Sequence, residues 1–577
     1  MAVDLAIRGG LVVDGTGAPG RHVDIGIKAG RIVSIGKLQE GASRVIDANG
    51  LVVAPGFIDP HTHYDAQVCW DTSLSPSPWH GVTTVLMGNC GVGIAPTRAD
   101  GRIPAMQDLV NVEGMPYDVM DAGITWDWQS FPEFMRATAQ RRPAANVAFL
   151  APLTPFRYYV MGEAAIERAA NDDERARIRD LLREAVAAGA FGFSTTQLPN
   201  HMGHRGRPIA CRQADRAELR DYAQVLRDAG RGFIEVALTE QMSVLSDSNL
   251  EMLEFLLRES GRPVTWLALL HRDDIPQACS ASLAKAAHLT SLGSVPQICA
   301  RPLTRDMDLR TPHSFMSFKS WHRALNLSVE EQKRVYADPA FRNQFRQELK
   351  GPAQFTGNWE LMAVAEAKSP HLEHFTGQTI AAVGRQQGKD GVDALLDLAI
   401  EDNLQTEFAL AFLNTNQEGV ASLLRTPGTV LGLSDGGAHL GVLCDAGYPT
   451  YLLGHWVRER RALSIEHAVM RLTSEPARLL GLRDRGQIAE GMAADLAIFD
   501  PDTVGSDERA HKRFDLPGGA KRFVMPSRGM HYTIVAGESV FENGADTGAR
   551  PGVHLRSSAQ AGFQRLRLAS VQRQLPA

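Results

Sequence analysis

Two histidines separated by one residue, His61 and His63, follow a short apolar stretch that begins at Gly56. In a β-strand, residues i and i+2 project from the same face, so both imidazoles can bind one ion. A His-x-His pair alone is weak evidence, but here it ends an apolar strand and is followed by polar residues. We therefore expect His61 and His63 to be metal ligands.

A second candidate is Asp435, in a Ser-Asp-Gly-Gly sequence that ends another apolar stretch. A carboxylate there can bind a metal ion and also accept a proton from water, which would make Asp435 both a ligand and the general acid/base. The alternative is an aspartate that only stabilises the Gly-Gly turn. His439, four residues later, is a candidate for a ligand, a substrate contact or a loop contact.

Cys90 follows a third apolar stretch, within a Gly-Asn-Cys-Gly sequence. Thiolate is a good zinc ligand, although a single buried cysteine is more often a small apolar residue. Cys90 is therefore a less certain metal ligand than the two histidines.

Three residues in polar segments are candidates for contact with a substrate. Arg301 follows a predicted strand and can hold a carboxylate through two hydrogen bonds, with a salt bridge to a loop acid as the alternative. His201 and His204 lie in a polar loop with several glycines. Exposure to solvent is the simpler interpretation for both histidines.

The elements that must position these residues alternate between short apolar runs and amphipathic helices, which is typical of parallel α/β folds. One helix is predicted to begin after Asn171, which forms a capping box with Glu174, and to end at Gly189. The predicted strands are 56–59, 82–87, 146–150, 191–194, 233–238, 264–269, 294–299 and 430–434. Eight parallel strands predict a TIM-type (β/α)8 barrel with its active site at the carboxyl ends of the strands.

Both ends of the chain contain short strand-like sequences separated by turns. Neither end is long enough to bury a core alone, so we expect residues 1–55 and 483–545 to form one composite β-sandwich. The barrel then occupies residues 56–482 and carries an inserted helical subdomain at about 303–425. Residues 546–577 are expected to form a C-terminal arm.

The composition excludes several classes of protein. The chain has 577 residues, a net charge of −6 and six scattered cysteines. It contains no apolar stretch long enough to span a membrane, no disulfide framework and no dense basic cluster for nucleic acid. No signal peptide is recognisable at the N-terminus. We expect a cytoplasmic enzyme that acts on a small molecule.

Several phrases resemble the amidohydrolase superfamily and, within it, the D-aminoacylase (N-acyl-D-amino-acid deacylase) group. They are Gly-Phe-Ile-Asp-Pro-His-Thr-His at 56–63, Gly-Asn-Cys-Gly at 88–91, Val-Glu-Gly at 112–114, Trp-Asp-Trp at 126–128, Tyr-Val-Met-Gly at 159–162 and Gly-Met-Ala-Ala-Asp-Leu at 491–496. The resemblance implies a metal-dependent hydrolase with a barrel and a composite β-sandwich, often assembled as a homo-oligomer. It also implies that His61, His63 and Cys90 line the metal site and that Asp435 is the catalytic acid/base.

The sequence departs from this group at the residues that, in D-aminoacylases, hold the tight zinc together with the cysteine. The predicted fifth and sixth strands lack the group's histidines, and His271 comes about three residues after the sixth. No lysine occurs between residues 38 and 284, so a carboxylated lysine cannot bridge two metals there. We therefore expect one Zn²⁺ per chain, with another divalent metal as the alternative. Its expected ligands are His61, His63, Asp435 and Cys90, with Glu235 as a reserve oxygen ligand.

The leading hypothesis is hydrolysis of a linear amide, in an N-acyl (D-)amino acid or a related N-acyl amide. Residues 439–451 lack the arginine that D-aminoacylases have after the catalytic aspartate, so other amides are open. One alternative is a cyclic amidase of the hydantoinase or dihydropyrimidinase type. Another is a degenerate, non-catalytic scaffold with an amidohydrolase fold, which the missing histidines motivate.

Overall fold

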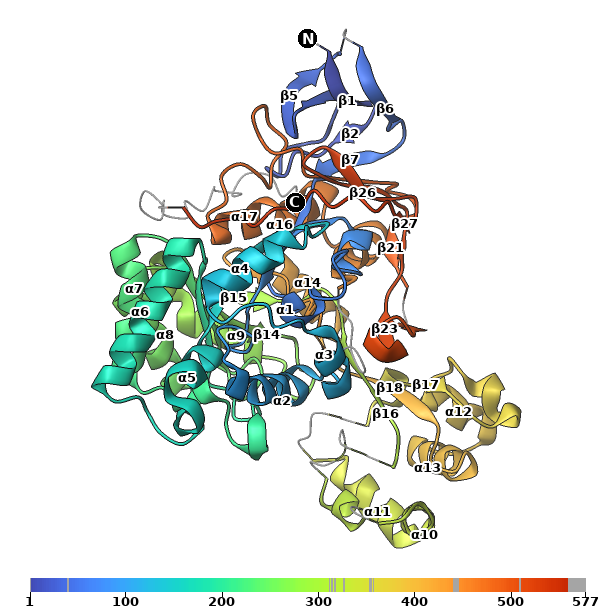
Figure 1. Cartoon of the computed structure of the whole chain (residues 1–577). Helices are drawn as coiled ribbons and strands as arrows, with labels where there is room; N and C mark the ends of the chain where they lie inside the picture. Colours follow the sequence, from blue (N-terminus) through green and yellow to red (C-terminus); the bar gives the residue numbers. More distant parts are fainter. Residues whose placement is uncertain are drawn as a thin grey trace. The chain divides into compact units, whose positions relative to one another are not determined.

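The computed structural model describes residues 2–38, 41–310, 312, 315, 318–324, 327–351, 355, 357–438, 446–507 and 510–558. The chain divides into two compact units (Figure 1). The larger unit comprises Met1–Leu269, Cys279–Arg301 and Ala421–Ala577, and the smaller one Leu270–Ala278 and Pro302–Val420.

Eight parallel strands form in the larger unit at the predicted places, which confirms the α/β class. They are β8 (Phe57–Asp59), β9 (Val82–Met87), β10 (Asn146–Phe149), β12 (Gly192–Thr196), β13 (Phe233–Ala237), β14 (Val264–Leu269), β15 (Ser294–Ile298) and β19 (Val430–Leu431). Every residue in them is buried, as expected for parallel strands that are covered on both faces.

The strands pair in chain order. One parallel sheet contains β8, β9 and β10, and a second runs from β11 (Ala151–Pro152) through β12, β13, β14 and β15 to β19. Two contacts join the sheets. The Phe191 N–H donates to the Phe149 carbonyl at 2.7 Å, and Thr62 and Gly436 form a parallel bridge just after β8 and β19. The carboxyl ends of β8 and β19 therefore lie side by side.

Helices cover these strands. Figure 1 shows α6 (Asp172–Ala188), α7 (Arg216–Ala229) and α8 (Asp247–Ser260) next to one another. The predicted start of α6 is confirmed, because the Asn171 side chain accepts from the Glu174 N–H and the Glu174 side chain accepts from the Asn171 N–H. Gly189 ends the helix at a φ of 115°, in the left-handed region that favours glycine.

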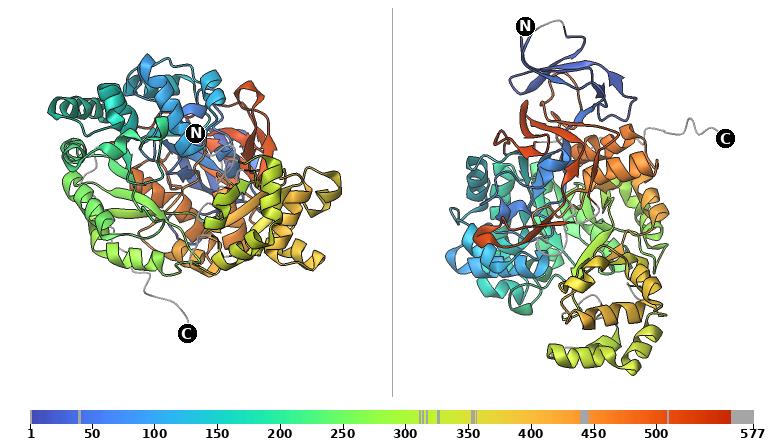
Figure 2. Two further views of the ribbon diagram at one scale, coloured as in Figure 1. Left: turned by 90° about the horizontal axis from the view of Figure 1, so that it is seen from below. Right: turned by 90° about the vertical axis from the view of Figure 1, so that its right-hand side faces the viewer.

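Strands from the two ends of the chain share a seven-stranded sheet, visible in Figure 2 as neighbouring blue and orange-red strands. Its members are β2 (Leu11–Val12), β3 (Arg21–His22), β7 (Val52–Pro55), β20 (Leu496–Phe499), β25 (Met530–Val535), β26 (Glu538–Glu542) and β27 (Ala545–Asp546), with β7 antiparallel to β20. A four-stranded sheet contains β1 (Val3–Arg8), β4 (Asp24–Lys28), β5 (Arg31–Gly36) and β6 (Ala42–Asp47). One apolar cluster, including Leu5, Ile25 and Ile498, joins both sheets.

The described part of the predicted C-terminal arm continues to contact the larger unit. The Val553 carbonyl accepts from the Val147 N–H at 3.0 Å, and the Leu555 N–H donates to the Val147 carbonyl at 2.8 Å. The Leu555 side chain belongs to the same apolar cluster as Ile58 and Phe233, so this segment contributes to the core of the parallel strands.

The smaller unit combines four predicted helices with a three-stranded antiparallel sheet. The helices are α10 (Val329–Ala337), α11 (Pro339–Glu348), α12 (Ile380–Gln387) and α13 (Gly391–Glu401), and the strands are β16 (Leu303–Met307), β17 (Met362–Glu366) and β18 (Glu407–Leu413). The predicted helical subdomain thus also contains a sheet that the sequence analysis did not predict. Its strands are short and come from segments far apart in sequence, so their local patterns are weak.

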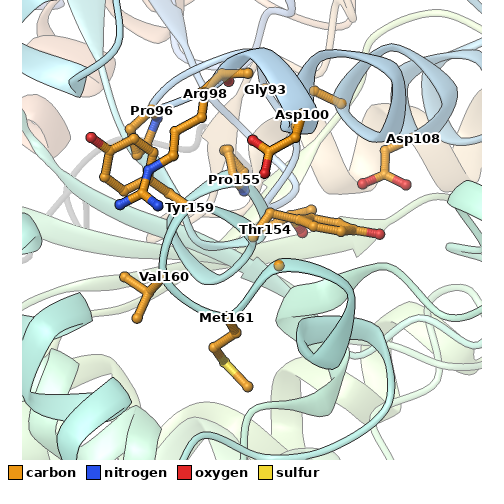
Figure 3. A pocket seen from close by; sticks show the side chains of 15 residues that line it. Gly93, Pro96, Arg98, Asp100, Asp108, Thr154, Pro155, Tyr159, Val160 and Met161 are labelled. Atoms are coloured by element: carbon orange, nitrogen blue, oxygen red, sulfur yellow. The ribbon is translucent and has the colours of Figure 1, made fainter.

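Two helices of the larger unit are important below. They are α2 (Arg102–Glu113) and α5 (Leu153–Met161), which flank a cavity of about 230 Å³ together with the loop from Gly93 to Gly101 (Figure 3). None of the described helices is both long enough and apolar enough to span a bilayer.

Candidate metal centre

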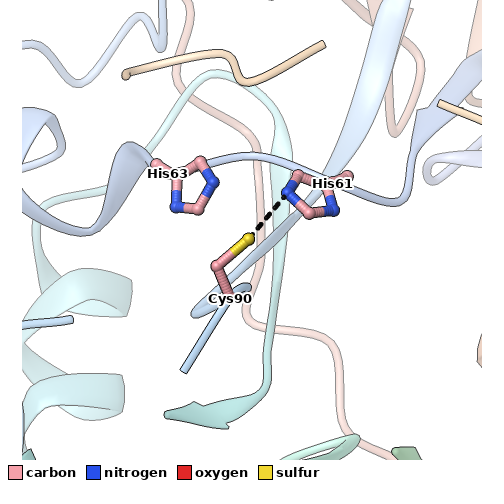
Figure 4. Close-up of side chains that lie close together, drawn as sticks. All are labelled: His61, His63 and Cys90. Atoms are coloured by element: carbon pink, nitrogen blue, oxygen red, sulfur yellow. Dashed lines mark hydrogen bonds between the residues drawn. The ribbon is translucent and has the colours of Figure 1, made fainter. Parts of the chain in front are cut away.

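The structure brings the four predicted metal ligands together. His61, His63 and Cys90 are buried, and each offers one ligand atom within 4.8 Å of those of the others (Figure 4). His61 Nε2 lies 3.6 Å from Cys90 Sγ. Asp435 Oδ1 lies 3.4 Å from His61 Nε2 and 3.8 Å from His63 Nε2.

The two histidines are held by the turn that carries Asp435. The His63 N–H donates to the Gly436 carbonyl at 2.7 Å, and Ser434 Oγ donates to the His61 carbonyl at 3.2 Å. Gly437 has a φ of +91°, and a Cβ there would lie 2.7 Å from the His63 carbonyl oxygen. The second glycine of the Gly-Gly pair is therefore required for the close approach of the two segments.

The loop that carries Cys90 is fixed by side chains from two neighbouring strands. Glu235 on β13 accepts from the Cys90 N–H through Oε2 at 2.8 Å. Ser194 on β12 accepts from the Gly91 N–H at 3.0 Å and donates to the Gly88 carbonyl. These bonds hold Cys90 at a φ of +57°, which is uncommon for a residue other than glycine.

Glu235 itself is fully buried, and its Oε1 has no hydrogen-bond partner among the described residues. Burial raises the pKa of this carboxyl group to about 8, and the nearby Asp435 carboxylate also raises it. A buried carboxylate oxygen without a partner costs free energy, which a bound cation would offset. Glu235, the predicted reserve ligand, therefore accepts from the Cys90 N–H with one oxygen, and its other oxygen has no hydrogen-bond partner among the described residues.

Glu113 is a site residue that the sequence did not identify. It ends α2, is buried, and places Oε2 3.4 Å from His63 Nε2. Burial raises its pKa well above the usual range, and the carboxylates of Asp435, Asp65 and Glu235 raise it further. The only signal for Glu113 was its place in the Val-Glu-Gly phrase, because one glutamate at a helix end has no diagnostic spacing.

Gln297 on β15 is a second residue that the sequence did not identify. Its Oε1 lies 2.9 Å from His61 Nδ1. When Nδ1 carries the proton and donates to Gln297, Nε2 keeps its lone pair on the side of Cys90 and Asp435. This is the arrangement in which a second residue orients a histidine for metal binding.

The donor set fits zinc. Imidazole nitrogen, thiolate sulfur and carboxylate oxygen are all zinc ligands, and bonds of about 2.0–2.3 Å in tetrahedral geometry place ligand atoms about 3.3–3.7 Å apart. The separations of 3.4 Å between His61 and Asp435 and 3.6 Å between His61 and Cys90 fall in that range, and the 3.8 Å between His63 and Asp435 lies just above it. Burial raises the pKa of the Cys90 thiol well above its usual value, and the nearby acids Glu235, Glu113 and Asp435 raise it further, so a cation is needed to favour the thiolate.

The predicted substrate residues lie outside this group. Arg301 Nη1 donates to Ser506 Oγ at 2.6 Å, and its guanidinium lies 4.6 Å from the ring centroid of Tyr451. The His204 N–H donates to Asp108 Oδ1 at 2.7 Å. The His201 carbonyl accepts from the Ile209 N–H at 3.2 Å, within the same loop.

Two other histidines, His439 and His271, were also considered from the sequence. His439 lies outside the described residues. His271 follows β14, and its N–H donates to Asn414 Oδ1 at 2.6 Å within the smaller unit. Among the described residues, the cluster of His, Cys, Asp or Glu ligand atoms within 4.8 Å of one another contains His61, His63 and Cys90, and Asp435 lies beside it.

The sequence model of the amidohydrolase family matches residues 44–541, and the chain belongs to that family. It is 28% identical over 561 residues to a D-aminoacylase of Alcaligenes xylosoxydans xylosoxydans, an alignment that covers 96% of this chain and 98% of the relative. The prediction of a metal-dependent amidohydrolase that resembles D-aminoacylases and acts on carbon–nitrogen bonds other than peptide bonds is confirmed.

Two solved structures agree with this assignment. One is an N-acyl-D-glutamate deacylase from Bordetella bronchiseptica, complexed with zinc and a phosphonate that mimics the tetrahedral intermediate. It is 26% identical to this chain with a TM-score of 0.64, and the match covers 96% of this chain and 100% of that one. A D-aminoacylase with a binuclear metal centre, activated by one metal and attenuated by the second, is 25% identical with the same TM-score and the same coverage.

Proposed function

We propose that the chain hydrolyses the amide bond of N-acyl-D-amino acids through one Zn²⁺ held by His61, His63, Cys90 and Asp435, with a further coordination position for water. The observation that carries the proposal is the buried cluster of His61, His63 and Cys90, whose ligand atoms lie within 4.8 Å of one another, with Asp435 Oδ1 3.4 Å and 3.8 Å from the two imidazoles. Deacylases of N-acyl-D-amino acids that match nearly the whole chain support it.

A bound Zn²⁺ supplies Lewis acidity, which lowers the pKa of water to about 7 and polarises a carbonyl group. The Asp435 side chain is 18% exposed, whereas the His61 and His63 rings are fully buried. Asp435 is therefore the member of the group that a substrate can reach. Its carboxylate accepts a proton from the attacking water and delivers it to the departing nitrogen as the carbon–nitrogen bond breaks.

One ion per chain is proposed because the sequence offers few ligands for a second. Neither β13 nor β14 contains a histidine, and no lysine occurs between residues 38 and 284. We also infer that the eight parallel strands close into a (β/α)8 barrel. The bridge between Thr62 and Gly436 and the bond between Phe191 and Phe149 support closure, because they join the two sheets at both edges.

A linear substrate is preferred to a cyclic one because deacylases match most of the chain at 28–29% identity, whereas the hydantoinase structures are only 13–15% identical. The contacts of Arg301, His201 and His204 with substrate stay predictions, as do the cytoplasmic location and the homo-oligomer. If Arg301 binds the substrate carboxylate, Arg301→Gln raises KM more than it lowers kcat.

The proposal is tested by zinc content and by a substrate panel. The panel contains N-acetyl derivatives of D- and L-leucine, methionine, aspartate and glutamate, together with hydantoin and dihydrouracil. We expect one zinc per chain and turnover of at least one D-derivative, lost in Asp435→Asn and kept in the exposed control Asp502→Asn. Full activity after complete removal of metal, or turnover of the cyclic compounds alone, would contradict the proposal.

A further inference from the structure

The cavity of about 230 Å³ beside the candidate metal centre has no part in the proposed reaction. It is lined by the first half of α2, by α5 and by the loop from Gly93 to Gly101 (Figure 3). None of the metal-ligand candidates His61, His63 and Cys90 lines it. Pockets for drug-sized ligands enclose about 300–1,000 Å³, so this one suits a smaller metabolite.

One wall of the cavity carries a buried acid with an unsatisfied oxygen. Asp108 is only 2% exposed, and its Oδ1 accepts from the His204 N–H at 2.7 Å. Its Oδ2 has no hydrogen-bond partner among the described residues. Burial raises the pKa of Asp108 to about 7, so the carboxylate predominates at pH 8. A ligand that donates to Oδ2 would remove the cost of the missing bond.

A cation lies across the cavity from this acid. The Arg98 guanidinium lies 4.5 Å from the ring centroid of Tyr159, and it has no ion pair with the part of the chain that the structure describes. Figure 3 shows Arg98 and Asp108 on opposite sides, with Asp100 between them. A guanidinium can stack on an aromatic ring and still bind a carboxylate through its N–H groups.

We propose that this cavity binds a free α-amino acid, with the carboxylate at Arg98 and the ammonium group at Asp108. Two opposite charges on facing walls match a zwitterion, and Pro155, Val160 and Met161 supply apolar surface for its side chain. This inference rests on the proposed function in one respect: a free amino acid is a product of the proposed amide hydrolysis. Binding itself requires no turnover.

The cavity is close to the candidate metal centre. Asp108 and Glu113 are five residues apart on α2, which is about 7.5 Å along the helix axis. Glu113 lies 3.4 Å from His63, as described above. An amino acid could therefore bind the protein at the cavity or at the metal, and the experiment must separate these two sites.

Calorimetric titration of the zinc-loaded enzyme at pH 8 with glycine, D- and L-alanine, and D- and L-leucine tests the proposal. We expect saturable binding of at least one amino acid at one site per chain. In the zinc-free His61→Ala/His63→Ala protein, which is not expected to hydrolyse them, the N-acetyl and methyl ester derivatives of that amino acid should bind at least tenfold more weakly, because each lacks one charge. Asp108→Asn and Arg98→Gln should each weaken binding at least tenfold. Arg102→Gln is the matched control, because Arg102 stacks on Trp126 and does not line the cavity.

Three outcomes would overturn the proposal. The first is an absence of binding for every amino acid, and the second is undiminished binding in both Asp108→Asn and Arg98→Gln. The third is binding that disappears in the zinc-free His61→Ala/His63→Ala protein, because the amino acid would then occupy the metal. Binding at the cavity without any amide hydrolysis would support the inference and count against the proposed function.

Discussion

Two fully buried glutamates, Glu218 and Glu235, have opposite surroundings. Glu218 on α7 forms an ion pair with the buried Arg157, and accepts from the Tyr222 hydroxyl at 2.9 Å and from the Ala170 N–H at 2.6 Å. Glu235 on β13 accepts only from the Cys90 N–H, and its second oxygen has no hydrogen-bond partner among the described residues. Among the described residues, Arg157 is the cation that pairs with Glu218, and no cation pairs with Glu235.

This difference separates a structural acid from a functional one. A buried carboxylate is tolerated when a cation and hydrogen bonds satisfy it, as at Glu218. At Glu235 the nearby charged group is another carboxylate, Asp435, which raises its pKa instead of lowering it. Perturbed, unsatisfied groups of this kind concentrate at functional sites, where a ligand completes them. The predictions below test this assignment.

The largest effect is expected from His61→Ala/His63→Ala, which removes two of the four proposed zinc ligands. Zinc content should fall below about a tenth of an ion per chain, and kcat/KM should fall more than about a thousandfold, because water activation by the metal is lost. Metal analysis and turnover of an N-acetyl-D-amino acid measure both. His371→Ala, at an exposed histidine, is the control and should keep its zinc and activity. A double variant that keeps its zinc would show that His61 and His63 do not bind it, and Glu235 would then not lie beside a metal site.

The next largest effect is a loss of stability when Glu218 loses its ion-pair partner Arg157. Arg157→Met leaves Glu218 buried without its partner, which should lower the free energy of unfolding by about 3–5 kcal/mol. Urea denaturation followed by circular dichroism measures this loss. Zinc content per folded chain should stay unchanged. A variant that unfolds at the wild-type urea concentration would show that the ion pair is not structural.

The sequence predicted the elements better than it predicted contacts between them. All eight parallel strands were found, because each is a short apolar run bounded by turns. His61, His63 and Asp435 were singled out because they lie directly after such runs, and Asp435 Oδ1 lies 3.4 Å and 3.8 Å from the two imidazoles. Gln297 was not found, because it contacts a histidine 236 residues away and lies inside an ordinary strand. Glu113 was missed for the same reason, since only the packing of α2 brings it to His63.

Glu235→Gln should moderately weaken zinc binding without lowering stability, whereas Glu218→Gln should lower stability without weakening zinc binding. Loss of the charge beside Cys90 should weaken zinc binding by about 10–100-fold, as is common for residues that support metal ligands. The zinc-free protein should not lose stability, because the substitution removes a buried acid that has no cation. Glu218→Gln should instead destabilise the zinc-free protein and leave zinc affinity unchanged.

Competition for zinc with a chromogenic chelator and thermal unfolding of the metal-free proteins separate these two glutamates. Equal destabilisation by Glu235→Gln and Glu218→Gln would show that both are structural acids. Unchanged zinc affinity in Glu235→Gln would remove Glu235 from the candidate metal centre, while leaving the four proposed ligands in place.

The last effect is confined to acid pH and comes from His80, a buried base whose titration must be distinguished from that of the acids. His80 Nδ1 lies 2.7 Å from Thr450 Oγ1 and Nε2 lies 2.8 Å from the Met525 carbonyl oxygen, and burial lowers its pKa to about 4. Its pKa in an unfolded chain is about 6.5. Between pH 6.5 and 4 the unfolded chain binds a proton that the folded chain does not. Stability therefore falls as the pH is lowered through this range, by up to about 1.4 kcal/mol per pH unit.

Urea midpoints of the wild type and His80→Gln at pH 7.5, 6.5, 5.5 and 4.5 isolate this contribution. Above pH 6.5 the two proteins should differ by a constant amount, because His80 is neutral in both the folded and the unfolded chain. The difference should then shrink as the pH falls, since only the wild type loses stability through His80. A difference that stays constant down to pH 4.5 would show that the acid sensitivity arises elsewhere, with the buried carboxylates as the next groups to test.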